Sequence, residues 1–122
     1  MSKNGSINGH RLYNLNKLYE IEQYDENFIQ DLVKLFLETM SSQSDDLLKY
    51  CEEKNWERVY CIAHKMKANI DLLSIEMLKN EIRFVEHNAR AGTSLNDLRE
   101  KISFIHAGLQ EVAAQLDADF QQ

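Results

Sequence analysis

The sequence predicts an all-α protein, an antiparallel up-down four-helix bundle with a short extra N-terminal helix. Three observations predict it. The 122 residues include no proline and only four glycines, so few positions interrupt a helix. Apolar side chains recur at spacings of three and four along most of the chain, which is the period of an amphipathic helix. The segments between these patterns are short, and short connections place consecutive helices antiparallel.

The composition is that of one folded domain. Apolar residues make up 43% of the chain and charged residues 28%, as is usual for globular proteins. We expect the bundle to span residues 14–120 and a flexible N-terminal tail to occupy residues 1–13. Four complementary apolar stripes can satisfy one another, so we expect a monomer.

Charge and hydropathy limit the partners. The net charge of −6 argues against nucleic acid, because a phosphate backbone requires a basic face. No stretch reaches the roughly 20 apolar residues that span a bilayer, and the polar start does not resemble a signal peptide. We therefore expect a cytoplasmic protein without a membrane partner.

The first two helices are expected to start at polar caps. A short helix follows Asn14 and runs to about Gln23, and it needs a larger surface to pack on. Asp25 can cap a second helix that ends near Glu53. Its apolar series is Phe28, Ile29, Leu32, Phe36, Met40, Leu47, Leu48 and Cys51. Three serines, at 41, 42 and 44, interrupt this series and allow either one helix or two. We favour one long helix because the apolar phase continues past them.

The last two helices also have recognisable ends. Ser74 is expected to cap a helix that ends at Gly92, a residue that suits the left-handed C-terminal position. Ser94 is expected to cap the final helix, with Asp97 in the capping-box position. The apolar series are Ile75, Leu78, Ile82, Val85 and Ala89, and then Leu95, Leu98, Ile102, Ile105, Leu109, Val112 and Leu116.

The helix that precedes these two carries the candidate site. It follows the cap Asn55 and runs to about Leu72, with apolar positions Trp56, Val59, Ala63, Met66, Ile70 and Leu73. At roughly 100° per residue, His64 falls about 140° from the centre of this stripe. An accessible imidazole is therefore expected, with Lys67 one turn along and the small Ala68 beside it.

The antiparallel hairpin brings a carboxylate to this imidazole. With the fold point near residue 75, the series Tyr60, His64, Lys67, Asp71 runs beside Arg90, Glu86, Arg83, Lys79, an alignment that spacing fixes to within one helical turn. It pairs His64 with Glu86. If Glu86 accepts from Nδ1–H, Nε2 becomes an exposed nucleophile. Lys67 and Arg83 would then offset negative charge on an arriving phosphoryl group.

The run Ala63-His64-Lys65-Met66-Lys67-Ala68-Asn69 resembles the signature of histidine-containing phosphotransfer (HPt) domains, roughly A-H-x-L-K-G-S. Tyr24-Asp25-Glu26-Asn27-Phe28, Leu35-Phe36-Leu37-Glu38 and Glu53-Lys54-Asn55-Trp56 resemble further segments of that family. The resemblance implies a helical bundle that relays phosphoryl groups between receiver-domain aspartates, or from a histidine kinase. His64 would be the phospho-accepting residue, Lys67 the lysine three positions on, and Glu86 the glutamate that some members bond to the histidine.

The resemblance also implies partners. These are a response-regulator receiver domain, a hybrid histidine kinase, or both. No cofactor is implied for this chain, since any Mg²⁺ would belong to the receiver, and no glycine-rich phosphate loop indicates an ATP-using kinase. We expect the receiver to dock over Ala68, which replaces the family's usual glycine. The flanking candidates are Lys65 and Asn69, with Leu15, Leu18 and Ile21 of the first helix.

Other functions are less well supported by the pattern. A non-catalytic adaptor bundle that docks a signalling partner fits the helices but gives no reason for an exposed His64. A di-iron bundle needs Glu-x-x-His pairs, and no histidine here has a glutamate three positions before it. We expect no metal site. Cys51 and Cys61 are expected to be buried or half-buried thiols, and His87 and His106 to have no catalytic role.

Overall fold

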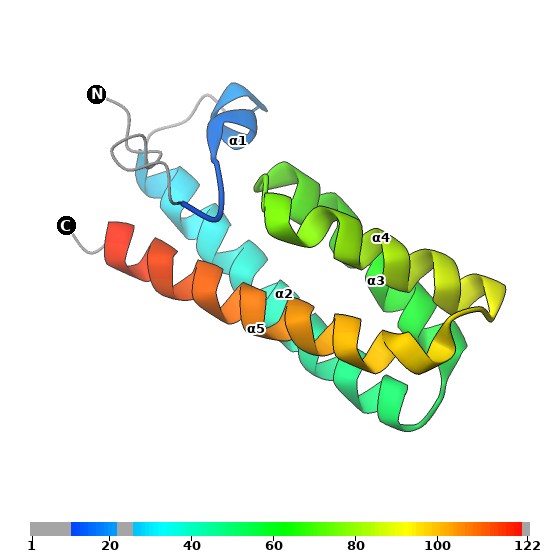
Figure 1. The fold of residues 1–122 in the computed structure, drawn as a ribbon. Helices are drawn as coiled ribbons and strands as arrows, with labels where there is room; N and C mark the ends of the chain where they lie inside the picture. Colours follow the sequence, from blue (N-terminus) through cyan, green and yellow to red (C-terminus); the bar gives the residue numbers. More distant parts are fainter. Residues whose placement is uncertain (1–10, 22–25, 121–122) are drawn as a thin grey trace.

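A computed structural model describes residues 11–21 and 26–120 and shows five helices in this part of the chain (Figure 1). They are α1 (Asn16–Ile21), α2 (Glu26–Glu52), α3 (Trp56–Leu72), α4 (Glu76–Ala91) and α5 (Leu95–Phe120). Of the four long helices, α2 and α4 each pack against both α3 and α5. Neighbouring helices run antiparallel, so the predicted four-helix bundle with a short additional helix is confirmed.

The core consists of the predicted apolar stripes. The buried apolar side chains of the three later helices are Val59, Ala63, Met66 and Ile70 in α3, Leu78, Ile82, Val85 and Ala89 in α4, and Leu98, Ile102, Ile105, Leu109, Val112 and Leu116 in α5. Each large one contributes about 1.5–3 kcal/mol when it leaves water. None of the helices in residues 11–21 and 26–120 is long and apolar enough to cross a membrane.

Helix α2 is continuous through its serines, as predicted. Ser44 is buried, and its hydroxyl donates to the carbonyl of Ser41 at 3.0 Å. The same oxygen lies 2.9 Å from Nδ1 of His106 on α5, which can donate to it. A polar residue is therefore accommodated in the core, because its hydroxyl has a partner both as a hydrogen-bond donor and as an acceptor. Phe28, placed in the predicted stripe, is instead 43% exposed.

The connections on either side of α3 differ from each other. Asn55 caps α3 as predicted, because its Oδ1 accepts from the Arg58 amide at 3.3 Å. Ser74, the predicted cap of α4, is not one. It has a φ of 52°, and its amide donates to the carbonyl of Asp71 at 3.1 Å. Ser74 therefore lies in the turn after α3, whose C-cap is Leu73. Ile75 occupies the cap position of α4 without a side-chain hydrogen bond.

The end of α4 and the start of α5 are held through the backbone. Gly92 has the predicted left-handed conformation, with a φ of 74°, and its amide donates to the carbonyl of Asn88 at 2.8 Å. Ser94 precedes α5 with a φ of 51°. The amide of Asp97 donates to the Ser94 carbonyl at 3.0 Å.

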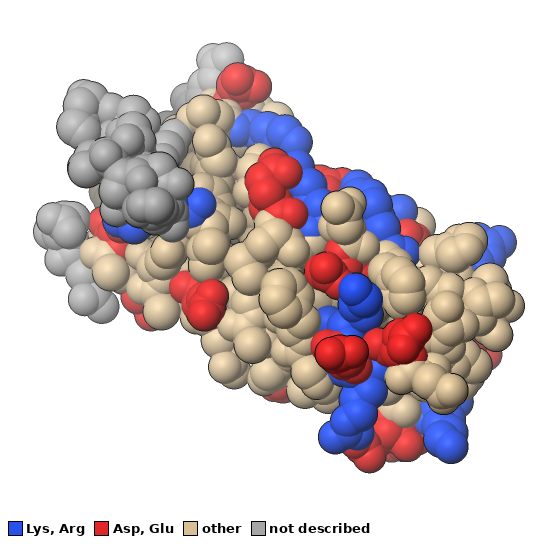
Figure 2. All heavy atoms as spheres, viewed as in Figure 1, with Lys and Arg blue, Asp and Glu red and all other residues tan. Residues whose placement is uncertain are grey.

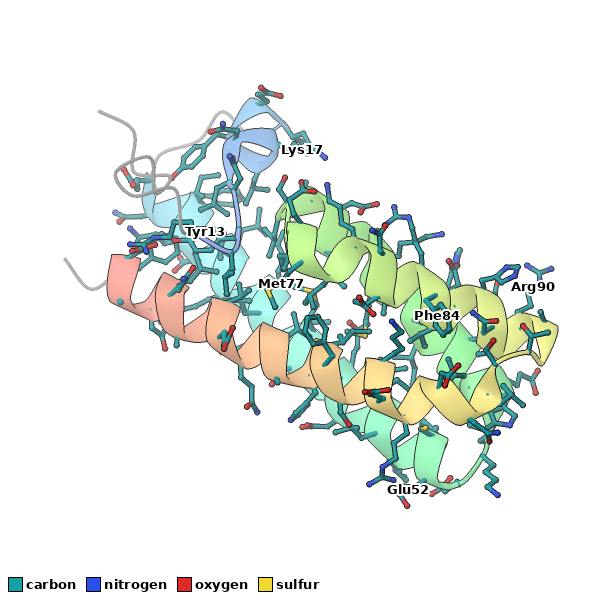
Figure 3. All side chains as sticks on the ribbon, viewed as in Figure 1. Tyr13, Lys17, Glu52, Met77, Phe84 and Arg90 are labelled. Atoms are coloured by element: carbon teal, nitrogen blue, oxygen red, sulfur yellow. The ribbon has the colours of Figure 1, made fainter. Side chains whose placement is uncertain are left out.

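The N-terminal segment packs on one end of the bundle. Asn14 accepts from the amide of Asn16 through Oδ1 at 2.8 Å, which places the predicted cap at the start of α1. Residues 11–13 belong to the predicted flexible tail, yet Tyr13 is buried (Figure 3). Arg11 pairs with Asp119 on α5 at 2.6 Å. Residues 1–10, the predicted helix end at Gln23 and the predicted cap Asp25 lie outside the described residues.

Candidate functional site

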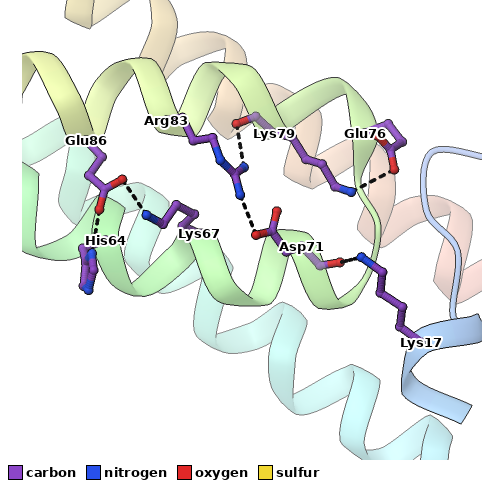
Figure 4. Close-up of polar contacts among 8 residues, drawn as sticks. All are labelled: Lys17, His64, Lys67, Asp71, Glu76, Lys79, Arg83 and Glu86. Carbon is purple, nitrogen blue, oxygen red and sulfur yellow. Dashed lines mark hydrogen bonds and ion pairs between the residues drawn. The ribbon is translucent and has the colours of Figure 1, made fainter. Parts of the chain in front are cut away.

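The α3–α4 hairpin brings His64 and Glu86 together (Figure 4). Helices α3 and α4 are joined by a short turn, so residues at similar distances from it lie side by side. Nδ1 of His64 lies 2.6 Å from Oε2 of Glu86. The pairing predicted from spacing is therefore correct.

Lys67 completes a three-residue cluster around the same carboxylate. Its Nζ donates to Oε1 of Glu86 at 2.9 Å. The Glu86 side chain is 14% exposed and that of His64 is 58% exposed. A covered carboxylate thus anchors an accessible imidazole and a cation one helical turn away.

The electrostatics of Glu86 favour its ionised form. Burial would raise the pKa of Glu86, but the hydrogen bonds from His64 and Lys67 and their charges outweigh burial and lower it. An ionised carboxylate only accepts hydrogen bonds, so Nδ1 of His64 must carry the hydrogen. In the neutral ring, the lone pair then resides on Nε2. Within the described part of the chain, no group hydrogen-bonds to Nε2.

An aromatic contact on the other side of His64 was not predicted. The rings of Tyr60 and His64 stack with their centroids 5.9 Å apart and their planes at 24°. Arg90 lies over the Tyr60 ring at 5.3 Å and donates from Nη1 to its hydroxyl at 3.2 Å. The sequence alignment of α3 with α4 predicted that Tyr60 lies beside Arg90, but it did not predict that the Tyr60 ring stacks on His64. The i, i+4 spacing of the two rings on α3 was the available signal.

Arg83 lies in a different contact from the one expected. It donates from Nη2 to Oδ2 of Asp71 at 2.6 Å and from Nη1 to the carbonyl of Lys79 at 3.1 Å. The hydrogen bond from Arg83 is the main reason that the pKa of Asp71 is lowered. The predicted role of Arg83 beside His64 is therefore corrected: its fork reaches one turn further along α3 and pairs with a carboxylate there (Figure 4).

The predicted docking residues divide into two groups. On α3, Lys65 and Ala68 are exposed and Asn69 is half-buried. In the N-terminal segment, Leu15 and Leu18 are only 3% and 2% exposed, so their predicted place on an accessible surface is wrong. They join the core because the apolar side of this segment covers the end of its own bundle. Ile21 is 65% exposed.

Charge on the visible face is mixed rather than of one sign. Figure 2 shows basic side chains gathered along the edge where α4 lies, with acidic side chains between them. Lys79 pairs with Glu76 within α4 at 2.9 Å, and Lys101 of α5 pairs with Glu81 of α4 at 3.1 Å. Charged side chains of α4 are therefore partly neutralised by neighbours of opposite sign.

The remaining candidate residues do not form a second site. Cys51 is buried, and burial raises the pKa of its thiol. Cys61 is exposed rather than buried or half-buried, which corrects the prediction. Among residues 11–21 and 26–120, no cluster of three or more His, Cys, Asp and Glu side chains could hold a metal ion.

No protein-family model, no curated protein and no solved structure matches this chain.

Proposed function

We propose that this protein accepts a phosphoryl group on Nε2 of His64 and passes it on, as HPt proteins do between receiver-domain aspartates or from a histidine kinase to a receiver. The observation that carries the proposal is the 2.6 Å contact between Nδ1 of His64 and Oε2 of Glu86. It holds the proton on Nδ1 and leaves the lone pair of Nε2 on the exposed side of α3.

The transfer step balances without a further reactant. The Nε2 lone pair attacks the phosphorus of an aspartyl phosphate, the Nε2–P bond forms, and the P–O bond to the aspartate breaks. The electron pair leaves with the carboxylate. The imidazole ring becomes positively charged while Nδ1 keeps its hydrogen. Glu86 stabilises that developing charge through a charge-assisted hydrogen bond, and the same step in reverse hands the group to another aspartate.

Lys67 would offset the negative charge of the phosphoryl group. Its Nζ is held by Oε1 of Glu86 at 2.9 Å and lies one turn along α3 from the reacting ring. A phosphoryl group is stabilised mainly by positioning and by nearby cations. The Glu86 carboxylate therefore orients both the nucleophile, His64, and the cation that would stabilise the phosphoryl group, Lys67.

The surface next to His64 suits an approaching domain. Ala68 is exposed and small, so a partner backbone can come close to the ring. The resemblance of the run from Ala63 to Asn69 to the HPt signature supports this proposal. A receiver domain would supply the aspartate and its Mg²⁺, and this chain would supply the imidazole.

The test is transfer from phosphorylated receiver domains carrying a labelled phosphoryl group. The wild-type chain should take up label that is lost in acid and survives alkali, as phosphohistidine does. His64→Gln should take up none. His87→Gln, which removes an exposed histidine from α4, is the matched control and should behave as wild type. A folded wild-type chain that takes up no label from a panel of receivers would overturn the proposal in favour of a non-catalytic adaptor bundle.

A further inference from the structure

His64 is constrained on a second side by an aromatic ring. Tyr60 lies one turn before it on α3, and the two rings stack at 5.9 Å with an interplanar angle of 24°. Tyr60 is in turn fixed by Arg90, which lies toward the C-terminal end of α4 (Figure 3). The guanidinium is 5.3 Å from the Tyr60 ring centroid, and its Nη1 donates to the hydroxyl at 3.2 Å.

We propose that Tyr60, anchored by Arg90, is a positioning residue that sets the plane of the His64 ring for attack through Nε2. This inference rests on the proposed phosphotransfer function. Tyr60 itself does not touch the phosphoryl group in this scheme. It acts through the imidazole, and Arg90 acts through Tyr60.

Two contacts are needed because each constrains a different motion. The hydrogen bond from Nδ1 to Glu86 restrains one atom of the imidazole, but coupled rotation about the χ1 and χ2 torsions of His64 can still tilt the ring plane. A stacked neighbour opposes that rotation, because turning the ring would separate the two faces. With both contacts present, Nε2 points in one direction, and a nucleophile held in the reactive orientation reacts faster.

The Tyr60 hydroxyl explains how the stacking ring is itself held. The Tyr60 side chain is half-buried, so packing alone leaves its outer edge open to solvent. The donation from Arg90 to the hydroxyl ties that edge to α4. The chain of contacts therefore runs from Arg90 through Tyr60 to His64 and ends at Glu86, with its two ends on α4 and its two rings on α3.

The test compares Tyr60→Leu, Tyr60→Phe and wild type in transfer from one phosphorylated receiver. Tyr60→Leu removes the stacked ring and should lower the maximal transfer rate by about tenfold. The receiver concentration giving half-maximal rate should stay unchanged, because docking is intact. Tyr60→Phe keeps the stack and should stay within about threefold of wild type. Tyr50→Leu, which removes another half-buried tyrosine in contact with basic side chains, should leave the rate unchanged.

A second measurement does not depend on transfer. The NMR shifts of the His64 ring protons report the neighbouring aromatic face, so they should change in Tyr60→Leu and persist in Tyr60→Phe. Arg90→Gln removes the guanidinium that lies over the Tyr60 ring as well as the hydrogen bond to its hydroxyl. It should change the shifts in the same direction as Tyr60→Leu but by less.

Equal maximal rates for wild type and folded Tyr60→Leu would overturn the inference. So would a Tyr60→Phe variant as slow as Tyr60→Leu, or ring-proton shifts that ignore Tyr60. If the wild-type chain takes up no label at all, the proposed function fails, whereas the NMR shifts still decide whether Tyr60 orients His64.

Discussion

Oε2 of Glu86 lies 2.6 Å from Nδ1 of His64, and this contact joins the two helices of the α3–α4 hairpin. The other carboxylate oxygen holds Lys67 at 2.9 Å. The negative charge of Glu86 is thus shared between His64 and Lys67. In the proposed transfer, the His64 ring would become positive and Lys67 would face the arriving phosphoryl group. We expect Lys67 to shift toward the phosphoryl group once His64 is modified.

Glu86→Gln should slow phosphotransfer without preventing folding. The amide oxygen can still accept from Nδ1–H, but it no longer offers a full negative charge to the developing imidazolium. Hydrogen bonds to ionised groups are roughly twice as strong as neutral ones, and a loss of about 1.4 kcal/mol in the transition state corresponds to about tenfold in rate. We therefore expect a decrease of about tenfold in the rate of label uptake.

The matched control for this variant is Glu81→Gln. Glu81 lies on the same helix and pairs with Lys101 at 3.1 Å, so its loss removes one charge from α4 without touching the cluster. Uptake by Glu81→Gln should equal that of wild type. Equal rates for all three proteins would show that the Glu86 carboxylate does not assist the reaction.

The lowered pKa of Glu86 predicts a loss of stability in acid. Burial alone would raise this pKa, but the hydrogen bonds from His64 and Lys67 hold it below its ordinary value of 4.5. Below pH 4.5 the unfolded chain therefore binds the proton more readily than the folded one. The stabilisation from Glu86 is present in full above that pH and is lost as the pH falls through the lowered pKa of the folded state.

Urea unfolding followed by circular dichroism between pH 7 and pH 3 would measure this effect. The free energy of unfolding of wild type should fall more steeply below about pH 4.5 than that of Glu86→Gln. Asp71 also has a lowered pKa through its hydrogen bond from Arg83, but it is present in both proteins and cancels in the comparison. Two parallel curves would contradict the prediction.

Ala68→Gln should block transfer while the bundle stays folded. Ala68 is exposed on α3, and glutamine is a good helix former, so the free energy of unfolding should change by less than about 0.5 kcal/mol. The longer side chain would occupy the space through which a receiver approaches His64, and label uptake should fall below about a tenth of wild type.

Ala68→Gly is the matched control for the docking prediction. It keeps the approach open and should transfer normally, although it destabilises α3 by about 1 kcal/mol. Normal uptake by a folded Ala68→Gln variant would mean that the receiver does not approach over this residue.

The sequence was sufficient for the His64–Glu86 pair because helices on either side of a short turn advance at the same rise per residue. It was not sufficient for Arg83. The long fork of this side chain can reach more than one level of α3, and it binds Asp71 at 2.6 Å. Spacing determines which backbone positions are adjacent, whereas the choice of partner depends on the rotamer.

The errors in the core have a similar origin. The apolar side of the N-terminal segment predicted that Leu15 and Leu18 would be covered, but periodicity does not distinguish its own bundle from a partner protein. Burial of Ser44 was missed because it depends on His106, which lies 62 positions away. A pattern that sorts residues into apolar and polar cannot detect a polar residue whose hydrogen bonds are satisfied within the core.

Ser74→Gly should stabilise the protein, although Ser74 stands where a helix cap was expected. Its φ is 52°, and the left-handed conformation costs a residue with a Cβ about 1–2 kcal/mol. Glycine removes that cost but loses more backbone freedom on folding, so we expect a gain of up to about 1 kcal/mol. Ser74→Ala should change stability by less than about 0.5 kcal/mol, because no side-chain cap is lost, whereas removal of a true cap costs about 1 kcal/mol.

Ser103→Gly is the control, since Ser103 is exposed within α5 and glycine there should destabilise by about 0.5 kcal/mol. Urea unfolding of the three variants measures these differences, and a destabilised Ser74→Ala with an unchanged Ser74→Gly would restore the capping role.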